Sequence, residues 1–478
     1  MKIDELLDGV EVIKKTDTVK EVNGIVDDSR EVKKGNLFAA LKGEVFDGYD
    51  FCREALDKGA SVILAEKELD EDIPYILVPN ARKAFSRIVS NFYGNPSAKL
   101  KVMGVTGTNG KTTTSYLLSS LFPNSVCFST VKYIGVSGNI KAINTTPSPI
   151  LLHKEMAGAY ERGLKTIILE VSSIGLDQDR VSDVDFDYAI FTNITRDHLD
   201  YHKSFENYLK AKARFFESLK DDRIAVINAD DPNAPYFIER TKSKVVTFGF
   251  KRGNILGNIL QNSGKGLNLK IEGMGRTLEV FSPLVGSFNA RNILAAASVG
   301  ILENLSDSEI NERIASAPVP PGRLEKIESP ENISVFVDYA HTPDALFSVL
   351  SSLKEYDPSR IITVFGAGGH RDKGKRGLMG SVVSGLSDVV IVTSDNPRDE
   401  NPDDIIDDIF EGISDKKAIR LTDRRKAIFK ALSLAKEGDF VLIAGKGHED
   451  YQEIKGKRIP FSDKKCVKEF YKYERNRT

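Results

Sequence analysis

The chain has 478 residues, enough for about three domains of ordinary size. Hydrophobic residues make up 41% and charged residues 28%, which is the composition of a soluble globular protein. A formal net charge of −2 gives no electrostatic basis for binding nucleic acid or an anionic membrane.

Other global features indicate a reducing aqueous compartment. The longest apolar runs, such as 440–444, have the length of a strand and are far too short to span a membrane. The first residues lack the apolar core of a signal peptide. Cys52, Cys127 and Cys466 are too widely spaced for a zinc motif or a disulfide framework. We therefore expect a cytoplasmic protein without membrane insertion.

Two breaks divide the chain into three predicted domains. One is the turn at 94–97, and the other is the proline-rich connector at 318–322. The predicted domains span 1–98, 99–321 and 322–478.

All three domains are predicted to be α/β. The first mixes short strands, at 61–65 and 75–78, with a helix near 81–92. The second alternates apolar runs with amphipathic stretches, which predicts a mostly parallel sheet. Its strands are expected at 102–105, 166–170, 188–192 and 224–228. The third is predicted to be doubly wound with dinucleotide-fold character. Its strands are expected at 335–338, 361–365, 389–392 and 441–444, with a helix at 423–436.

The stretch 107–113, with the sequence GTNGKTT, directly follows the apolar run 102–105. A buried strand, a glycine-bounded turn and a helix that opens with lysine and hydroxyl residues form a site for polyphosphate. Lys111 can bridge the outer phosphates, and Thr112 can ligate magnesium. The spacing departs from the general Walker pattern, because Val105 stands where its first glycine is expected. We predict that this loop binds a nucleotide.

Acidic and histidine side chains follow the next two predicted strands. Glu170 ends its strand and is expected to bind magnesium, with a helix-capping role as the alternative. The following strand leads into 192–200, where His198 could bind a second cation and Asp197 could orient it or take a proton. A purely structural histidine is the alternative.

Two helices of the second domain carry polar groups whose roles stay open. The helix at 205–219 contains Lys210, Lys212 and Arg214, and such a cluster is typical of a solvated helix face. Asn289 and Asn292 share one face of another helix and could bind an adenine edge. Asn289 fits equally well as an N-cap.

Strand-end loops of the third domain combine glycines, cations and carboxylates. The stretch 366–376 is rich in glycine and cations and indicates anion binding. In the turn 395–398, Arg398 can grip a carboxylate through two hydrogen bonds. Asp395 and Glu449 could hold an ammonium group. Together they form the pairing that an amino acid requires, with surface salt bridges as the alternative.

These motifs, in this order, closely resemble those of the Mur ligases, ATP-dependent enzymes that form amide bonds in peptidoglycan synthesis. The resemblance covers essentially the whole chain and rests on six motifs: GTNGKTT (107–113), TNITRDHLD (192–200), DYAHTPDAL (338–346), GGHRDKGKR (368–376), DNPR (395–398) and GKGHEDY (445–451). It implies a UDP-binding first domain, a P-loop-type ATP-binding second domain and a Rossmann-like third domain that binds an amino acid.

Within the family, the chain is most similar to ligases that add meso-2,6-diaminopimelate to UDP-N-acetylmuramoyl-L-alanyl-D-glutamate. The resemblance implies that the D-glutamate carboxylate attacks the γ-phosphate of ATP, and that the amine of the added amino acid then attacks the acyl phosphate. It also implies Mg²⁺ as cofactor, these small molecules as the binding partners, and a monomer.

The resemblance assigns roles to matching positions. The implied catalytic residues are Lys111, Glu170, His198 and Lys212, and the implied magnesium ligands are Thr112, Glu170 and His198. Lys212 matches a lysine that family members carry as a carbamate, N6-carboxylysine. The implied ATP-binding residues are Gly107, Thr108, Asn109, Gly110, Lys111, Thr112, Thr113, Asn289, Arg323, Asp338 and His341.

The same resemblance assigns both remaining substrates. The implied positions for the UDP-linked substrate are Asp27, Ser29, Glu44, Val45, Phe46, Asn144, Thr145, Thr146, Ser172, Gln178 and Arg180. The implied positions for diaminopimelate are Arg371, Asp395, Asn396, Pro397, Arg398, Gly445 and Glu449. Three departures from the family pattern are Ile174 in place of histidine, His370 in place of an acid and Gly377 in place of proline.

Three alternatives remain at this stage. The same ligase could use L-lysine, although Arg398 favours diaminopimelate because it can clamp the extra distal carboxylate. A folylpolyglutamate synthetase would share the phosphate loop but is not expected to carry DNPR together with GKGHEDY. A nucleotide-binding regulatory protein without ligase activity is disfavoured by Glu170, His198 and Lys212.

Overall fold

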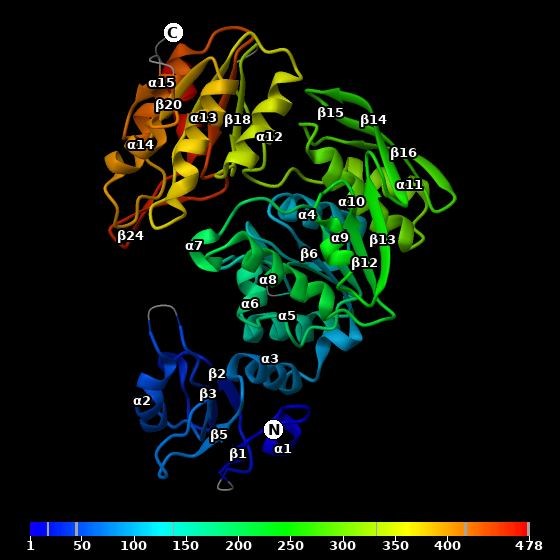
Figure 1. Cartoon of the computed structure of the whole chain (residues 1–478), viewed down its shortest axis with the longest axis vertical. Helices are drawn as coiled ribbons and strands as arrows, with labels where there is room; N and C mark the ends of the chain where they lie inside the picture. The colour runs from blue at the N-terminus through cyan, green and yellow to red at the C-terminus, as the bar shows by residue number, and fades with distance from the viewer. Residues whose placement is uncertain (17–18, 44–45, 137, 331, 415–417, 476–478) are drawn as a thin grey trace.

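The described residues form three sheets covered by helices, and Figure 1 shows them in three successive bodies. This computed structural model describes residues 1–16, 19–43, 46–136, 138–330, 332–414 and 418–475. Within these ranges, no helix combines the length and the apolar character needed to cross a membrane. The predicted three-part α/β architecture is confirmed. The boundaries proposed near 98 and 321 fall between the sheets and stay predictions.

The first domain is a small sheet covered on both faces. Its strand order is β1-β5-β4-β3-β2, with β1 antiparallel to β5 and the other pairs parallel. The strands are β1 (Lys14–Lys15), β2 (Gly24–Val26), β3 (Asn36–Ala39), β4 (Val62–Ala65) and β5 (Tyr75–Leu77). Helices α1 (Ile3–Leu6) and α3 (Ala81–Phe92) pack on one face, and α2 (Cys52–Asp57) packs on the other.

The central domain contains an 11-stranded sheet whose middle is parallel, as predicted. The parallel strands are β6 (Lys101–Thr106), β7 (Ser125–Phe128), β10 (Thr166–Glu170), β11 (Tyr188–Phe191), β12 (Ile224–Asn228) and β13 (Lys244–Gly249). Strands that the sequence does not reveal extend both edges: β8 (Lys132–Gly135) and β9 (Gly138–Lys141) at one, and β14 (Ile255–Ser263), β15 (Gly266–Gly273) and β16 (Arg276–Ser282) at the other. β14 pairs with β13 in parallel, and the other added pairs are antiparallel.

Helices cover both faces of the central sheet. One hydrophobic core lies under α4 (Lys111–Leu121), α10 (Asn289–Leu302) and α11 (Asp307–Ala315). The other lies under α5 (Pro149–Glu161), α6 (Ser173–Asp177), α8 (Phe205–Glu217) and α9 (Ala234–Ile238). The short helix α7 (Leu199–His202) follows β11.

The third domain is doubly wound, as predicted. Its strand order is β17-β18-β22-β19-β20-β21, and only the edge strand β17 is antiparallel to its neighbour among these strands. The strands are β17 (Glu325–Ile327), β18 (Ser334–Asp338), β19 (Ile361–Phe365), β20 (Val389–Val392), β21 (Ile419–Arg420) and β22 (Phe440–Ala444). Helices α12 (Pro343–Lys354), α13 (Arg376–Leu386) and α14 (Pro402–Phe410) cover one face, and α15 (Arg424–Leu434) and α16 (Asp463–Arg475) cover the other. A hairpin of β23 (Tyr451–Ile454) and β24 (Lys457–Pro460) stands apart from this sheet.

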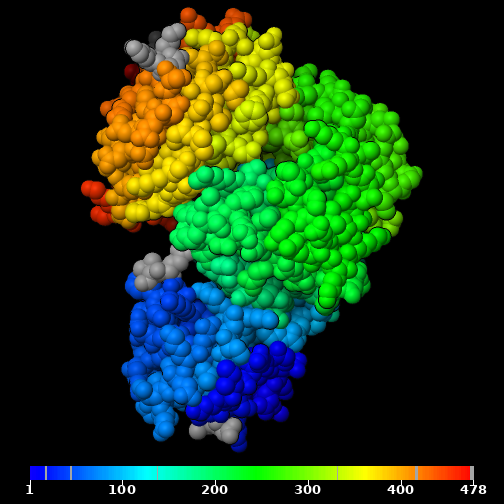
Figure 2. All heavy atoms as spheres, in the orientation of Figure 1, coloured from blue at the N-terminus to red at the C-terminus, as the bar shows by residue number. Residues whose placement is uncertain are grey.

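The central domain lies between the other two, as Figure 2 shows. The third domain is docked on it through hydrogen bonds near the phosphate loop: Arg323 Nη2 donates to Thr112 Oγ1 at 3.0 Å, and Asn109 Nδ2 donates to Asp344 Oδ2 at 3.0 Å. The first domain meets the central domain through an ion pair between Arg87 and Asp183 at 3.6 Å. The parallel strands of the two larger sheets therefore carry their terminal loops toward a shared interface.

Gly104 lies in the middle of β6, the strand that leads into the phosphate loop. A Cβ atom there would lie 2.4 Å from Phe215 Cζ and 2.8 Å from Phe186 Cε1. The two rings pack edge to face with centroids 4.8 Å apart, so neither has free space to move into. The missing side chain therefore lets α8 pack closely on the strand.

Replacing Gly104 with alanine is expected to reduce the free energy of unfolding by about 1–3 kcal/mol, because the added methyl group overpacks this core. Gly264 is the matched control, since a Cβ at that position meets no atom within 4 Å. The urea midpoint, followed by circular dichroism, should fall for Gly104→Ala and stay near wild type for Gly264→Ala. Equal midpoints for the two variants would contradict this packing argument.

Candidate active site

The phosphate loop has the strand–turn–helix geometry that the sequence predicts. It connects β6 to α4, and Gly110 precedes the helix with φ of 86°, in the left-handed region that favours glycine. A Cβ at Gly110 would lie 2.2 Å from Asn292 Oδ1. Lys111 Nζ folds back onto the loop and donates to the carbonyl groups of Gly107 and Thr108, both at 2.9 Å. The lysine ammonium is thus held where outer phosphates would bind.

A cavity of about 350 Å³ lies above this loop, between the central and third domains. Nine of the predicted ATP residues line it: Thr108, Asn109, Gly110, Lys111, Thr112, Thr113, Arg323, Asp338 and His341. Asn289 is buried instead; its Oδ1 accepts a hydrogen bond of 2.9 Å from Asn292, and Asn292 reaches the cavity. Phe288 occupies the N-cap position of α10, so the alternative of Asn289 as N-cap is wrong.

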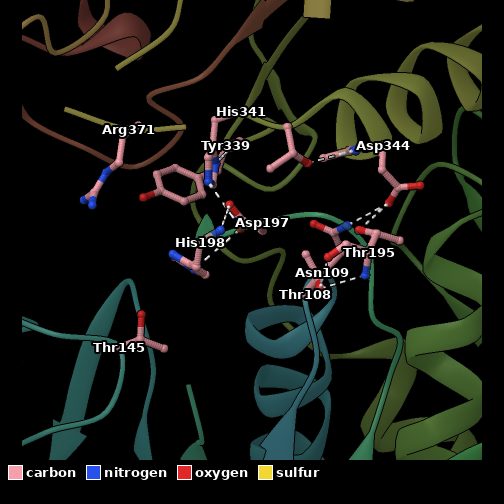
Figure 3. A network of polar contacts seen from close by, with 12 residues as sticks. Thr108, Asn109, Thr145, Thr195, Asp197, His198, Tyr339, His341, Asp344 and Arg371 are labelled. Atoms are coloured by element: carbon pink, nitrogen blue, oxygen red, sulfur yellow. Dashed lines mark hydrogen bonds and ion pairs between the residues drawn. The ribbon is translucent and has the colours of Figure 1, made fainter. Parts of the chain in front are cut away.

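A carboxylate and two histidines meet at one end of the cavity. Asp197 Oδ2 lies 3.5 Å from His198 Nε2 and 4.0 Å from His341 Nε2, as Figure 3 shows. Burial lowers the pKa of His341 to about 4 and also lowers the pKa of His198. Burial alone would raise the pKa of Asp197. The charges of His198, His341 and Lys375, together with a hydrogen bond from the His198 backbone, outweigh burial and lower this pKa. At neutral pH the carboxylate is therefore ionised and the imidazoles are neutral.

Lys212 is buried beneath the phosphate loop. Its side chain crosses from α8, and Nζ donates to the carbonyl oxygen of Gly107 at 2.9 Å and lies 4.9 Å from the centroid of the Tyr208 ring. Burial, and secondly the charge of Lys111, hold the pKa of Lys212 well below its usual range. The interpretation of this cluster as a solvated face is therefore wrong for Lys212. It is correct for Lys210, which is exposed and pairs with Glu206 at 2.7 Å.

Glu170 is fully buried at the end of β10. Its carboxylate accepts hydrogen bonds from Thr130 N at 2.9 Å and Thr130 Oγ1 at 2.8 Å. The alternative of a helix cap is wrong, because Ser172 caps the following helix, α6. Within the described ranges, no three His, Cys, Asp or Glu side chains form a metal-binding group. Magnesium at a nucleotide typically uses one or two protein oxygens together with phosphate and water, so Glu170 and Thr112 are a suitable donor set.

Four of the residues predicted for the UDP-linked substrate form one hydrogen-bonded cluster in the central domain: Thr146, Ser172, Gln178 and Arg180. Thr146 Oγ1 donates to Glu170 O at 2.9 Å and lies 3.0 Å from Ser172 Oγ, while Arg180 Nη1 donates to Thr146 O at 2.8 Å. Arg180 also binds Gln178 Oε1 at 2.6 Å, and its charge acts on Asp27 of the first domain.

The other predicted positions flank this cluster. Ser29 begins a short 3₁₀ turn in the first domain, and Phe46 is exposed. Glu44 and Val45 lie outside the described residues. Thr145 accepts from Thr130 Oγ1 at 3.2 Å, and the carbonyl of Asn144 accepts from the Tyr133 hydroxyl. Ile174, at the family's histidine position, lies half-buried in α6.

Several of the residues predicted for diaminopimelate form a hydrogen-bonded cluster in the third domain. Asn396 Nδ2 donates to Glu449 Oε2 at 2.8 Å, and a Cβ at Gly445 would lie 2.4 Å from Asp395 Oδ2. Lys446, which sequence reasoning missed, is fully buried here and donates to Asn396 Oδ1 and Glu449 Oε2 at 2.8 and 2.9 Å. Its place inside the GKGHEDY motif was the available signal.

Arg398 follows Pro397 beside this cluster with φ of 53°. Its backbone N donates to Glu453 O at 2.9 Å, its Nη1 donates to Gly369 O, and Glu453 Oε2 lies 3.4 Å from Nε. Arg371 lies near Arg398, since a Cβ at Gly368 would lie 3.2 Å from Arg398 Nη1 and 3.6 Å from Arg371 Cγ, and it pairs with Asp200 of the central domain at 3.1 Å. Of the two family departures nearby, His370 is exposed and Gly377 lies in the first turn of α13.

Tyr339 lies between the cavity and the third-domain cluster, since its ring packs against His448 of the GKGHEDY motif with centroids 5.3 Å apart. It lines the cavity, its ring lies 4.8 Å from the guanidinium of Arg323, and the charges of Glu449 and Asp395 act on its hydroxyl. The nucleotide-type cavity and the third-domain cluster are therefore neighbours. Such an arrangement can bring an amine to a group activated by phosphate.

Comparisons with known proteins match each of the three domains. The chain matches the Mur ligase family catalytic domain over residues 21–93, the Mur ligase middle domain over 105–300 and the Mur ligase glutamate ligase domain over 322–447. It is 42% identical to UDP-N-acetylmuramoyl-L-alanyl-D-glutamate–2,6-diaminopimelate ligase from Aquifex aeolicus, over 94% of each chain.

A solved structure of a ligase with the same name is 32% identical, with a TM-score of 0.68 over 99% of each chain. MurF ligase from Thermotoga maritima in complex with ADP, at 22% identity, has a TM-score of 0.68 over 96% of this chain and 99% of its own, which shows the shared fold.

Proposed function

The chain belongs to the Mur ligase family, and we propose that it adds meso-2,6-diaminopimelate to UDP-N-acetylmuramoyl-L-alanyl-D-glutamate with conversion of ATP to ADP and phosphate. The observation that carries this proposal is the position of Tyr339, which lines the phosphate-loop cavity while its ring packs against His448 of the GKGHEDY motif, with centroids 5.3 Å apart. The product would be a peptidoglycan precursor made in the cytoplasm by a monomer with domains at 1–98, 99–321 and 322–478.

In the first half-reaction, the D-glutamate carboxylate attacks the γ-phosphate of ATP. The chain's own contribution is charge and position, because phosphoryl transfer requires little covalent help from protein. Lys111 and the N-terminus of α4 neutralise phosphate charge from one side. Arg323 approaches from the third domain, where it already contacts Thr112, so domain docking completes the phosphate site.

Magnesium would be held by Thr112, Glu170 and His198, and it would supply further neutralisation of phosphate charge. Thr130 holds the Glu170 carboxylate in place through two hydrogen bonds. Thr146, a proposed dipeptide residue, donates a hydrogen bond to the backbone carbonyl of Glu170, a proposed metal ligand. This bond fixes the two proposed sites relative to each other.

Lys212 is proposed to act as its carbamate. A lysine reacts with carbon dioxide as the neutral amine, and the lowered pKa of Lys212 increases that fraction at neutral pH. The N–C bond forms, the amine loses one proton, and the product carries a negative charge. This anion would lie near Lys111, because Lys111 Nζ and Lys212 Nζ both donate to the Gly107 carbonyl at 2.9 Å.

In the second half-reaction, the amine of diaminopimelate attacks the acyl carbon and phosphate leaves. Asp395 and Glu449 would bind the ammonium group that does not react, and Arg398 would bind the distal carboxylate. The docked third domain holds the amine close to the acyl phosphate, which favours amide formation over hydrolysis.

An amino-acid panel tests this function. Phosphate release should require both the UDP-dipeptide and an amino acid, and meso-diaminopimelate should give a higher kcat/KM than L-lysine or D-lysine. A preference for L-lysine would replace the proposed substrate while retaining the ligase. Phosphate release with ATP alone would instead favour a nucleotide-operated regulatory protein.

A further inference from the structure

Two charged loops from different domains meet beside the active-site cavity. Arg196 of the central domain pairs with Asp372 of the third domain through contacts of 3.0 and 3.2 Å. In the opposite sense, Arg371 of the third domain pairs with Asp200 of the central domain at 3.1 Å. Each loop therefore contributes one arginine and one aspartate, and the two ion pairs cross the interface in opposite directions.

The Arg371–Asp200 pair engages a residue that the proposed function requires elsewhere. Arg371 is proposed to bind diaminopimelate, but in this structure a protein carboxylate already occupies its guanidinium. The side chains are 46% and 24% exposed, so water reaches the pair and its net strength is small. A substrate carboxylate can therefore compete with Asp200 for the same donors.

A second cation, Lys375, interacts electrostatically with Asp200. Lys375, on the same loop as Arg371, is buried, and no ion pair joins its ammonium to any of the described residues. Its charge interacts with Asp197 and Asp200 of the central domain. If Asp200 leaves Arg371, the charge of Lys375 can balance the freed carboxylate.

We propose that Asp200 is a positioning residue that holds Arg371 until a carboxylate of the incoming amino acid takes its place. The Arg196–Asp372 pair is separate from this exchange and keeps the two domains docked while it occurs. The proposal rests on the proposed function and adds to it a competition between protein and substrate carboxylates. Its consequence is that the apparent affinity for diaminopimelate is lower than the pocket alone would give.

The test is the effect of Asp200→Asn on each Michaelis constant separately. Loss of the competing charge should lower KM for diaminopimelate about two- to fivefold, the range expected for an exposed ion pair. KM for ATP and for the UDP-dipeptide should stay at wild-type values. A purely structural role would not lower KM for one substrate alone.

Asp372→Asn is the matched control, because it weakens the neighbouring ion pair by the same chemical change but frees no arginine of the amino-acid pocket. It should not lower KM for diaminopimelate. Asp200→Glu keeps the carboxylate and should restore the wild-type KM. Asp200→Ser is a second variant with the same expected decrease, in case the asparagine variant folds poorly.

The outcomes separate the two proposals. If the wild-type protein shows no phosphate release dependent on diaminopimelate, the proposed function and this inference both fail. If the wild type is active while Asp200→Asn and Asp200→Ser leave KM for diaminopimelate unchanged or raise it, the exchange is overturned and the ligase stands.

Discussion

Lys212→Ala is expected to lower kcat by about 100- to 1,000-fold, the range for removing one electrostatic group that is preorganised for the transition state. The side chain lies under the phosphate loop, where Nζ binds the Gly107 carbonyl, so its loss removes both the proposed carbamate and a support of the loop. Lys210→Ala is the matched control. That lysine lies on the same helix but is exposed, and its substitution should leave kcat unchanged.

The carbamate itself is testable in the same variants. With ¹³C-bicarbonate, the wild-type protein should show a carbamate carbon by NMR, and Lys212→Ala should lack it. Because the pKa of Lys212 is lowered, its amine stays neutral to lower pH than that of an ordinary lysine, so the signal should persist at neutral pH. A short carboxylic acid should partly rescue Lys212→Ala. Full activity of Lys212→Ala, or a carbamate signal that survives this substitution, would contradict the assignment.

Arg398→Lys is expected to raise KM for meso-diaminopimelate about 10- to 100-fold, since charged hydrogen bonds contribute about 1.5–3 kcal/mol and the point charge of lysine cannot replace the bidentate fork. KM for ATP should not change, because Arg398 lies beside the third-domain cluster and not in the lining of the nucleotide cavity. The measurement is steady-state kinetics with each substrate varied in turn.

Two comparisons make this prediction specific. KM for L-lysine, which has no distal carboxylate, should rise far less than KM for diaminopimelate. Arg420→Lys, an exposed arginine of the same domain that pairs with Asp407, should change neither constant. Equal effects on the two amino acids, or an unchanged KM for diaminopimelate, would remove Arg398 from the proposed role.

Features set by short stretches of chain could be predicted from sequence. The phosphate loop is one, because a buried strand, Gly107, Gly110 and Lys111 carry its geometry within a few residues. The doubly wound third domain is another, since each apolar run forms its own strand. The edge strands β14 to β16 were missed because their exposed face breaks up the apolar runs by which the parallel strands were identified.

Burial explains the most important error. Lys212 was grouped with Lys210 and Arg214 because all three carry charge in one short stretch. On the helix, however, Lys212 shares a buried face with Tyr208 and Phe215, four residues before it and three after. That spacing was visible in the sequence, but nothing local showed that Gly107 would lie opposite and accept a hydrogen bond from Lys212.

Contacts between domains could not be predicted from sequence at all. Arg371 and Asp200 are both present in the motifs, yet their pairing depends on how the third domain docks on the central one. The same is true of Arg323 and Thr112. Such contacts join loops far apart in the chain, so periodicity and local propensity carry no information about them.

Isotope transfer from the D-glutamate carboxylate to phosphate is the most direct test of the proposed ligase. The UDP-dipeptide would carry ¹⁸O in that carboxylate, and the phosphate released in the presence of ATP and meso-diaminopimelate would be analysed by mass spectrometry. One ¹⁸O atom per phosphate is predicted, because the carboxylate oxygen bonds to the γ-phosphorus and leaves with it when the amine displaces the acyl phosphate. Released phosphate without ¹⁸O would show that ATP is cleaved by water, and would contradict an acyl-phosphate ligase.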